Sequence, residues 1–210
     1  MISFCIGFYK TRKDKSMPIR FSETTLPGVT IVEPQVFKDA RGFFLETFHH
    51  KKYAQAGIDR IFLQDNHSHS SRGTVRGLHY QINHAQGKLV YVVFGEIFDV
   101  AVDIRRGSPT FGKWFGIILS EQNKKQIYVA EGFAHGFCVL SDTADVIYKC
   151  TDFYAPEDEG GIFWADPALG IEWPVKNPVM SEKDLNYPKL ADVPPDRLPA
   201  IAPQYQGKGV

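Results

Sequence analysis

Three parts of the sequence place polar residues among apolar ones in patterns that can support chemistry. They are Gln64–Ser68 with Gly73–Gln81, Tyr128–Phe137 and Ile147–Tyr154. Alternation along a strand puts His79 on the same face as the apolar Val75, so we expect its imidazole to face the protein interior. Histidine titrates near neutral pH and suits the role of general base, although an inward histidine taken alone is more often a core residue.

Two tyrosines bracket the end of the third part. Along a strand, Tyr148 and Cys150 face one way, and Ile147 and Lys149 face the other. A phenol in such a place either packs in the core or serves as a general acid, because it holds its proton at neutral pH. Tyr148 and Tyr154 are therefore candidate proton donors, with core packing as the alternative.

The sequence holds few signals for metal or nucleotide binding. It has neither a GxxxxGK[ST] motif nor a GxGxxG motif between a strand and a helix, so side chains must hold any phosphorylated ligand. His67-Ser68-His69 has the spacing of two metal ligands on a strand, but no third ligand follows at a telling distance. We interpret these histidines as exposed polar residues of a Ser-rich loop, and the sequence does not support a metal site.

Short strands must position the residues named above, because helix signals are scarce. Strands are predicted over these ranges: Thr30–Val36, Gly42–Phe48, Ile61–Asn66, Gly73–Gln81, Phe115–Leu119, Lys125–Val129, Gly136–Leu140, Val146–Thr151 and Gly161–Phe163. The stretch 88–104 alternates on both sides of Gly95-Glu96, which predicts a β-hairpin. Helices are predicted only over His50–Ala56, ended by Gly57, and over Ser181–Leu185, with Ser181 as the N-cap.

About ten short strands with few helices predict an all-β fold, either a sandwich or a small barrel such as a jelly roll. The length of 210 residues fits one domain, which we place at residues 17–187. Residues 1–16 are expected to form a dispensable, disordered N-terminal extension. The Pro-rich C-terminal tail, residues 188–210, is expected to pack loosely or to be disordered.

The composition excludes several classes of protein. With 24 Lys+Arg against 24 Asp+Glu, the chain lacks the basic excess that nucleic-acid binding requires. Its 43% apolar residues exclude a disordered chain, and no apolar stretch is long enough to span a membrane. Three cysteines without a CxxC motif, Cys5, Cys138 and Cys150, indicate free thiols and a cytoplasmic protein.

The order of these motifs is similar to that of a known family, the dTDP-4-dehydrorhamnose 3,5-epimerases. The resemblance covers about residues 26–187 and rests on these stretches: Phe37–Phe48, Gln64–Ser68, Arg76–Gln81, Gly87–Val90, Asp99–Arg105, Ser108–Gly112, Glu131–Phe137, Tyr148-Lys149 and Trp173-Pro174. One departure is Ala130, where members commonly have proline before Glu-Gly-Phe-Ala-His-Gly-Phe. We expect this change to affect the rigidity of a turn and not the chemistry.

The resemblance implies a cupin-type jelly roll that acts as a homodimer. It implies an isomerase that epimerises C3 and C5 of a dTDP-linked 4-keto-6-deoxyhexose, dTDP-4-dehydro-6-deoxy-D-glucose, to dTDP-4-dehydro-L-rhamnose in dTDP-L-rhamnose biosynthesis. Such a reaction removes a proton α to the C4 ketone and returns one from the opposite face. It needs a base, an acid and a group that stabilises the enolate oxygen, and the resemblance implies no cofactor and no metal.

The resemblance also assigns roles to residues. His79 is expected to be the base, and Asp184 to fix its tautomer and orientation. Tyr148 is expected to be the acid on the opposite face, and Lys88 the cation near the developing oxyanion. The residues expected to bind the substrate are Arg41, Phe44, Glu46, Gln64, Asn66, Arg76, His135, Tyr154 and Lys183. The stretch 41–46 is expected to reach the nucleotide of the neighbouring subunit.

Three alternatives stay open on the sequence. The first is an epimerase that acts at one carbon only, or on another nucleotide-linked 4-keto-6-deoxy sugar. The second is a non-catalytic cupin that binds a sugar or a partner protein, but such a protein is expected to lack the base, the acid or the cation. The third is a metal-dependent cupin dioxygenase, which usually needs an HxH followed by Glu where this chain has His79-Tyr80-Gln81.

Overall fold

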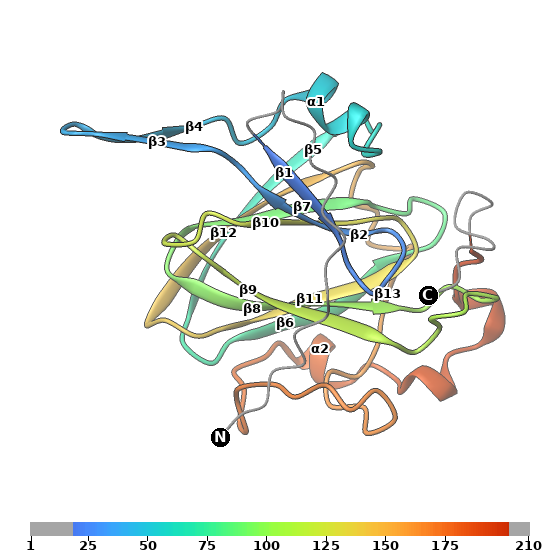
Figure 1. Cartoon of the computed structure of the whole chain (residues 1–210). Coiled ribbons are helices and arrows are strands. Elements are labelled where there is room, and N and C mark those ends of the chain that lie inside the picture. The colour runs from blue at the N-terminus through green and yellow to red at the C-terminus, as the bar shows by residue number, and fades with distance from the viewer. Residues whose placement is uncertain (1–18, 202–210) are drawn as a thin grey trace.

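Two β-sheets packed face to face form the body of the protein (Figure 1). The structure, a computed structural model, describes residues 19–201. The six-stranded sheet has the order β1-β2-β10-β7-β12-β5, and the five-stranded sheet has the order β13-β6-β11-β8-β9. The strands within both sheets pair antiparallel. The predicted all-β jelly roll is confirmed. Among residues 19–201, no helix has the length and apolar character needed to cross a membrane.

The elements are short and follow one another closely. Their bounds are β1 (Arg20–Glu23), β2 (Val29–Glu33), β3 (Val36–Asp39), β4 (Gly42–Leu45), α1 (His50–Gln55), β5 (Gln64–Ser71), β6 (Val75–Gln81), β7 (Lys88–Phe94), β8 (Glu96–Asp103), β9 (Trp114–Ser120), β10 (Gln126–Val129), β11 (Phe133–Val139), β12 (Thr143–Cys150), β13 (Glu159–Gly161), α2 (Glu182–Leu185) and the 3₁₀ helices η1 (Leu190–Asp192) and η2 (Pro195–Arg197). The strands β1 and β3 were not predicted, because the period-two signal is weak over four residues.

Apolar side chains fill the space between the sheets and also cover the outer face of the six-stranded sheet. One buried cluster joins Val92 of β7 with Ala101 of β8 and Leu119 of β9. The segment that carries α1 lies over the six-stranded sheet (Figure 1). Its Tyr53 is fully buried and donates a hydrogen bond of 2.7 Å to Gln126 of β10. The predicted helix at this position is confirmed.

The C-terminal segment covers the outer face of the five-stranded sheet. Ile162, Leu190 and Leu198 pack in a second buried cluster with Leu78 of β6 and Val102 of β8. The expectation of a loosely packed tail is therefore wrong for residues 188–201, since Leu190 of η1 and Leu198, which follows η2, are buried against the sheet. The N-terminal extension expected at residues 1–16 lies outside the described residues.

The predicted hairpin of residues 88–104 is wrong, although both of its strands exist. β7 pairs with β10 and β12, whereas β8 pairs with β9 and β11 in the other sheet. The chain changes sheets at Gly95, which has a φ of 79°. A Cβ at Gly95 would lie 2.2 Å from the carbonyl oxygen of Thr143, so only glycine fits this corner. Two strands that face each other across a core alternate as a hairpin does, and the pattern cannot separate the two.

An ion pair is buried at the end of β8. Asp103 and Arg105 have side chains that are 0% and 1% exposed, and Nη2 of Arg105 lies 2.7 Å from the carboxylate. The hydroxyls of Ser108 and Thr110 donate to the same carboxylate. Burial raises the pKa of Asp103, but these hydrogen bonds outweigh it and hold the pKa below its usual value. The charged Asp103 thereby fixes the loop that leads into β9.

Candidate active site

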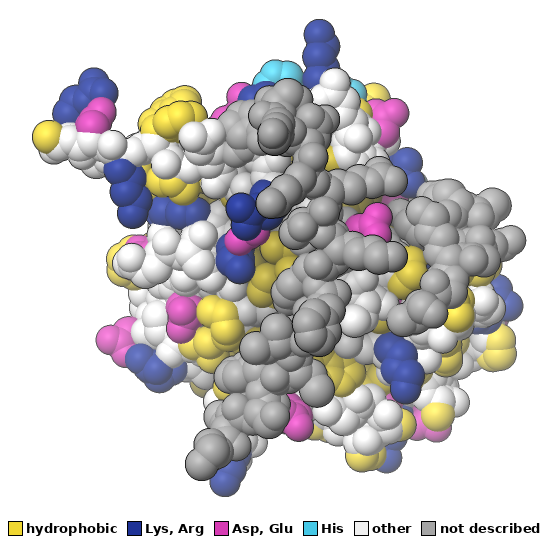
Figure 2. Space-filling view, in the orientation of Figure 1, with side chains coloured by type: hydrophobic (Ala, Val, Ile, Leu, Met, Phe, Trp, Pro, Cys, Tyr) yellow, Lys and Arg dark blue, Asp and Glu magenta, His cyan; other side chains and the backbone are white. Residues whose placement is uncertain are grey.

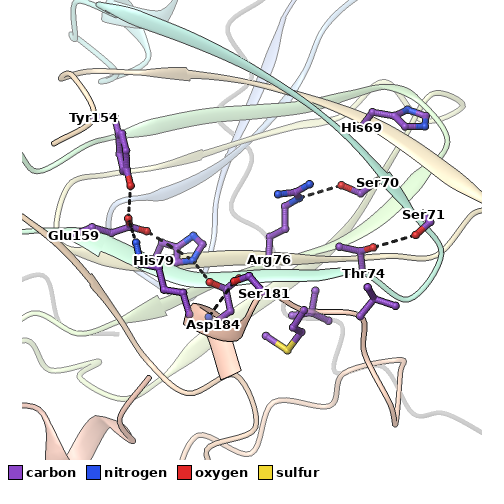
Figure 3. A pocket seen from close by; sticks show the side chains of 14 residues that line it. His69, Ser70, Ser71, Thr74, Arg76, His79, Tyr154, Glu159, Ser181 and Asp184 are labelled. Carbon is purple, nitrogen blue, oxygen red and sulfur yellow. Dashed lines mark hydrogen bonds and ion pairs between the residues drawn. The ribbon is translucent and has the colours of Figure 1, made fainter. Parts of the chain in front are cut away.

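Two neighbouring cavities share His79, Tyr154 and Glu159 in their walls. The larger cavity, about 500 Å³, lies along β5, β6 and the segment around α2 (Figure 3). The smaller cavity, about 270 Å³, receives side chains from both sheets. Its lining residues are Gln64, Asn66, His79, Tyr80, Gln81, Gln86, Lys88, Tyr148, Tyr154 and Glu159. Because three residues are common to both walls, we treat the cavities as two compartments of one site.

His79 of β6 and Asp184 of α2 form a hydrogen-bonded pair (Figure 3). Nε2 of His79 lies 2.9 Å from Oδ1 of Asp184. The imidazole also packs edge-on against Tyr187, with 5.7 Å between ring centroids. Since the carboxylate accepts the proton of Nε2, the lone pair of the neutral ring lies on Nδ1. The pair has the arrangement of a general base and its orienting carboxylate.

Asp184 is held in place by the start of its own helix and by β6. Ser181 is the N-cap, as predicted, and its hydroxyl accepts a hydrogen bond of 3.1 Å from the backbone N–H of Asp184. The backbone N–H of Gly77 donates to the second carboxylate oxygen at 3.2 Å. Burial raises the pKa of Asp184, but the hydrogen bond and charge of His79 outweigh it, so the pKa lies below its usual value. Asp184 is thus an ionised and fixed partner.

Tyr148 and Lys88 enter the smaller cavity from the sheet opposite His79. Lys88 begins β7 and Tyr148 lies on β12, which are adjacent strands of the six-stranded sheet. Burial raises the pKa of the Tyr148 phenol, and the neighbouring Cys150 adds to this effect, so the phenol keeps its proton at neutral pH. Burial lowers the pKa of the Lys88 ammonium. Lys88 forms no ion pair within residues 19–201, which leaves it available to a negatively charged ligand atom.

Gln64 and Asn66 add amide groups to the wall of the smaller cavity. Nε2 of Gln64 donates to Oδ1 of Asn66 at 3.0 Å. Oε1 of Gln64 accepts the backbone N–H of Tyr154 at 2.9 Å, which ties the loop after β12 to β5. The structure therefore brings both predicted residues, together with Tyr154, to the same cavity as His79.

Two of the expected cations lie in the larger cavity. Arg76 is on the same strand as His79, and its Nε donates to the hydroxyl of Ser70 at 3.0 Å. Lys183 precedes Asp184 on α2 and is ion-paired with Glu159. A guanidinium and an ammonium in one cavity suit an anionic group such as a diphosphate.

His135 does not reach either cavity. It lies opposite His79 in the register between β11 and β6, but its side chain is 7% exposed and its Nε2 lies 2.9 Å from the buried Asp99. His135 is thus not among the residues that line the two cavities, and its contact with the substrate stays a prediction. Its side chain lies on the same face of the five-stranded sheet as that of His79, and its ring is held there by Asp99.

Arg41, Phe44 and Glu46 lie on or beside an arm formed by β3 and β4, which projects from the body (Figure 1). Arg41 is 90% exposed and pairs with Asp39 at 2.6 Å, whereas Glu46 pairs with Lys52 at 2.7 Å. Figure 2 shows basic and apolar side chains gathered on the arm. None of the three residues lines either of the two cavities described above.

Sequence reasoning missed three residues around His79. Glu159 is on β13 and lines both cavities, Tyr187 packs on the imidazole, and Gln81 is buried in the wall beneath the loop of Tyr154. Gln81 was placed on the inward face with His79 but received no role. Glu159 and Tyr187 lie in Gly- and Pro-rich stretches without periodicity, so only long-range packing brings them to the site.

The HxH motif lies on a strand and not in the expected loop. His67 and His69 are both on β5, and both rings contact the carboxylate of Asp145 on β12, at 2.8 Å and 3.2 Å. The alternation of β5 turns these rings away from Asn66 and the smaller cavity. In the part of the chain that the structure describes, no group of three or more His, Cys, Asp or Glu side chains is arranged to hold a metal ion.

Comparison with known proteins agrees with this geometry. The model of the dTDP-4-dehydrorhamnose 3,5-epimerase family matches residues 23–192. The chain belongs to this family. An epimerase of that name from Shigella flexneri is 56% identical over 172 residues, which are 81% of this chain and 95% of that protein. The epimerase from Neisseria gonorrhoeae is 59% identical over 164 residues, which are 78% of this chain and 50% of that longer protein.

A solved structure of a dTDP-6-deoxy-D-glucose-3,5-epimerase from Legionella pneumophila, in complex with dTDP-4-keto-L-rhamnose, has the same fold. Its TM-score is 0.85 at 49% identity, and the match covers 88% of this chain and 99% of that chain. The predicted family, the fold and the isomerase class of this epimerase are therefore confirmed.

Proposed function

We propose that this chain inverts C3 and C5 of dTDP-4-dehydro-6-deoxy-D-glucose to give dTDP-4-dehydro-L-rhamnose. Both carbons flank the C4 ketone, so loss of a proton from either one gives an enolate whose charge lies on the C4 oxygen. Return of a proton to the opposite face inverts the carbon. The observation that carries this proposal is the His79–Asp184 pair, which faces Tyr148 and Lys88 across one cavity.

His79 acts as the base through Nδ1, because its Nε2 is engaged by Asp184 at 2.9 Å. When Nδ1 takes the proton, the ring becomes an imidazolium, and the adjacent carboxylate stabilises that charge. The low pKa of Asp184 supports this role, since an ionised carboxylate is required.

Lys88 and Tyr148 supply the other two functions from the opposite sheet. The Lys88 ammonium stabilises the developing oxyanion at C4, an interaction that is strengthened by poor hydration of the cavity. Tyr148 returns the proton to the face of the sugar away from His79. The raised pKa of its phenol supports this, because the acid must hold its proton until the enolate forms.

The two compartments divide the substrate between them. The sugar ring enters the smaller cavity, and the diphosphate lies in the larger one near Arg76 and Lys183. The amide groups of Gln64 and Asn66 in the cavity wall suit the sugar hydroxyls. The protein acts as a homodimer in which the arm of β3 and β4 completes the nucleotide site of its neighbour, since Arg41 and Phe44 are 90% and 70% exposed on their own chain. The cytoplasmic location and the absence of a cofactor stay predictions.

Incubation of the protein with the dTDP-linked 4-keto sugar in D₂O tests the proposal. The wild-type protein is expected to incorporate deuterium at C3 and at C5, as followed by NMR, and to support NADPH oxidation by an added 4-keto reductase. His79→Ala is expected to abolish the exchange at both carbons. His84→Ala, a histidine outside both cavities, is the matched control and is expected to exchange normally.

Full exchange in His79→Ala would overturn the assignment of the base. Exchange at one carbon only in the wild-type protein would replace the proposal with a single-carbon epimerase, and binding without exchange would indicate a non-catalytic cupin.

A further inference from the structure

Glu159 places a second carboxylate beside the base. It is the first residue of β13, which pairs with β6 so that Glu159 lies opposite Gln81 and Gly161 lies opposite His79. Its side chain is only 9% exposed, yet it lines both cavities. One carboxylate oxygen lies 3.8 Å from Nε2 of His79. A buried carboxylate at a junction of two cavities requires partners that compensate for its lost hydration.

The two oxygens of Glu159 have separate partners (Figure 3). Oε2 accepts a hydrogen bond of 2.6 Å from the Tyr154 hydroxyl and pairs with the ammonium of Lys183. Oε1 faces His79 and lies 3.4 Å from the Tyr187 hydroxyl. One carboxylate therefore connects four side chains from three different segments of the chain.

Glu159 remains charged in this setting. Burial raises its pKa, but hydrogen bonds from Lys183 and Tyr154 and the charge of His79 outweigh that effect, so the pKa lies below its usual value. A negative charge 3.8 Å from the imidazole favours the imidazolium that forms when the base takes a proton. Lys183 offsets the same charge toward the larger cavity, where a diphosphate would otherwise be repelled.

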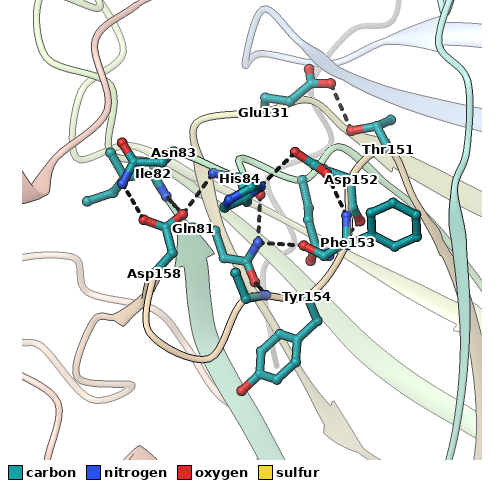
Figure 4. A network of polar contacts seen from close by, with 12 residues as sticks. Gln81, Ile82, Asn83, His84, Glu131, Thr151, Asp152, Phe153, Tyr154 and Asp158 are labelled. Atoms are coloured by element: carbon teal, nitrogen blue, oxygen red, sulfur yellow. Dashed lines mark hydrogen bonds and ion pairs between the residues drawn. The ribbon is translucent and has the colours of Figure 1, made fainter.

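Hydrogen bonds fix the backbone around Tyr154, so only the direction of its side chain is left to be set by other contacts. Gln64 accepts the N–H of Tyr154 at 2.9 Å. Figure 4 shows Gln81 beneath the same loop, where it accepts the N–H of Ala155 at 3.0 Å and donates to the carbonyl of Phe153 at 3.1 Å. The Tyr154 ring itself is 50% exposed, so few packing contacts restrain it. Its hydrogen bond to Glu159 is what orients the ring.

We propose that Glu159 is a positioning residue of the epimerisation, which holds the Tyr154 hydroxyl and the Lys183 ammonium at the junction of the two cavities beside His79. This inference rests on the proposed function. Glu159 acts through the groups it holds, because misplacement of a cavity wall by about 1 Å can slow a reaction by about 10²-fold. Its removal is therefore expected to slow turnover more than it weakens binding.

The test compares Glu159→Gln, Tyr154→Phe and the double variant in the exchange and coupled assays. Glu159→Gln keeps the shape of the side chain but removes its charge and one acceptor. We expect kcat to fall about tenfold and KM to change by less than about threefold, since the diphosphate ligands are retained. Adding Tyr154→Phe to Glu159→Gln is expected to lower kcat further by less than about twofold, because both changes break the same hydrogen bond.

Glu157→Gln is the matched control, since Glu157 is exposed two residues earlier and lines neither cavity. Glu159→Asp keeps the charge and is expected to recover part of the lost kcat. Wild-type kcat in Glu159→Gln, or losses that multiply in the double variant, would overturn the inference while the proposed function stands. A wild-type protein that exchanges no deuterium would overturn the proposed function and this inference together. If Glu159→Gln does not fold, an unaltered kcat in Tyr154→Phe would overturn the inference.

Discussion

Nε2 of His79 lies 2.9 Å from Oδ1 of Asp184, although the two residues are 105 positions apart in the chain. The contact joins β6 of the five-stranded sheet to a helix of four residues in the C-terminal segment. In the proposed mechanism this contact selects the tautomer of His79 and makes Nδ1 the atom that faces the substrate.

Asp184→Asn is expected to lower kcat by about two to four orders of magnitude, because an amide can present its NH₂ group to Nε2 and favour the wrong tautomer. KM is expected to change little, since Arg76 and Lys183 are untouched. Single-turnover deuterium exchange in D₂O measures the effect. Glu182→Gln, on the exposed side of the same helix, serves as the control. Near-normal exchange in Asp184→Asn would show that the carboxylate is not the orienting group.

Gly161→Ala is expected to destabilise the protein and to slow the reaction. A Cβ at Gly161 would lie 2.3 Å from the ring of Tyr187, which packs on His79. Overpacking of this kind typically costs about 1–3 kcal/mol. Urea unfolding of Gly161→Ala, Tyr187→Ala and the double variant gives the free energies. We expect Gly161→Ala to lower the free energy of unfolding clearly less in the Tyr187→Ala background than in the wild-type background. An equal loss in both backgrounds would contradict a contact between residue 161 and the ring of Tyr187.

Asp103→Asn is expected to lower the free energy of unfolding by about 3–5 kcal/mol, because it leaves the Arg105 guanidinium buried beside a neutral side chain. The folded pKa of Asp103 lies below that of the unfolded chain. Its contribution is therefore complete above about pH 5 and is lost as the pH falls through and below about 4. Denaturant unfolding measures the free energy of unfolding between pH 7 and pH 3. As the pH falls, this free energy should decrease less steeply in Asp103→Asn than in the wild-type protein. An equal decrease in both proteins would argue against an ionised Asp103.

The projecting arm predicts complementation between two inactive variants. In the proposed dimer, His79→Ala lacks the base, and Arg41→Ala lacks the cation that the arm would supply to its neighbour. In a mixed dimer, one site combines an intact base with an intact arm, so mixing and re-association should restore about a quarter of the wild-type activity. Each variant incubated alone is the control. Absence of recovery in a verified heterodimer would mean that the arm serves no neighbouring site.

Much of the site could be predicted because its residues lie in strands with a clear period of two. Alternation placed His79 inward on β6 and put Tyr148 on one face of β12 with Cys150, and the resemblance then supplied their roles. The partners of these residues could not be found in that way. Glu159 follows a turn and begins a strand of three residues, and Tyr187 lies in irregular chain, so neither has a periodic pattern to reveal its direction.

The fold class could be predicted from the sequence, but the pairing of the strands in the two sheets could not. Each half of the stretch 88–104 alternates as expected, yet the two halves belong to different sheets and are connected through Gly95. Proline content was misleading for residues 188–201, because the prolines there flank 3₁₀ turns that bury Leu190 and Leu198. Local composition predicts only that long helices and strands are absent. Whether a segment is buried depends on the surface against which it packs.

The late position of α2 has a consequence for synthesis of the protein. A nascent chain that ends before residue 181 already contains β6, β7 and β12, and with them His79, Lys88 and Tyr148. It does not contain Asp184, the hydrogen-bond partner of His79. Because synthesis proceeds from the N-terminus, the His79–Asp184 pair forms only after residue 184 has been added. In the proposed mechanism, a partly synthesised chain therefore has no orienting carboxylate for its base until the C-terminal segment covers the five-stranded sheet.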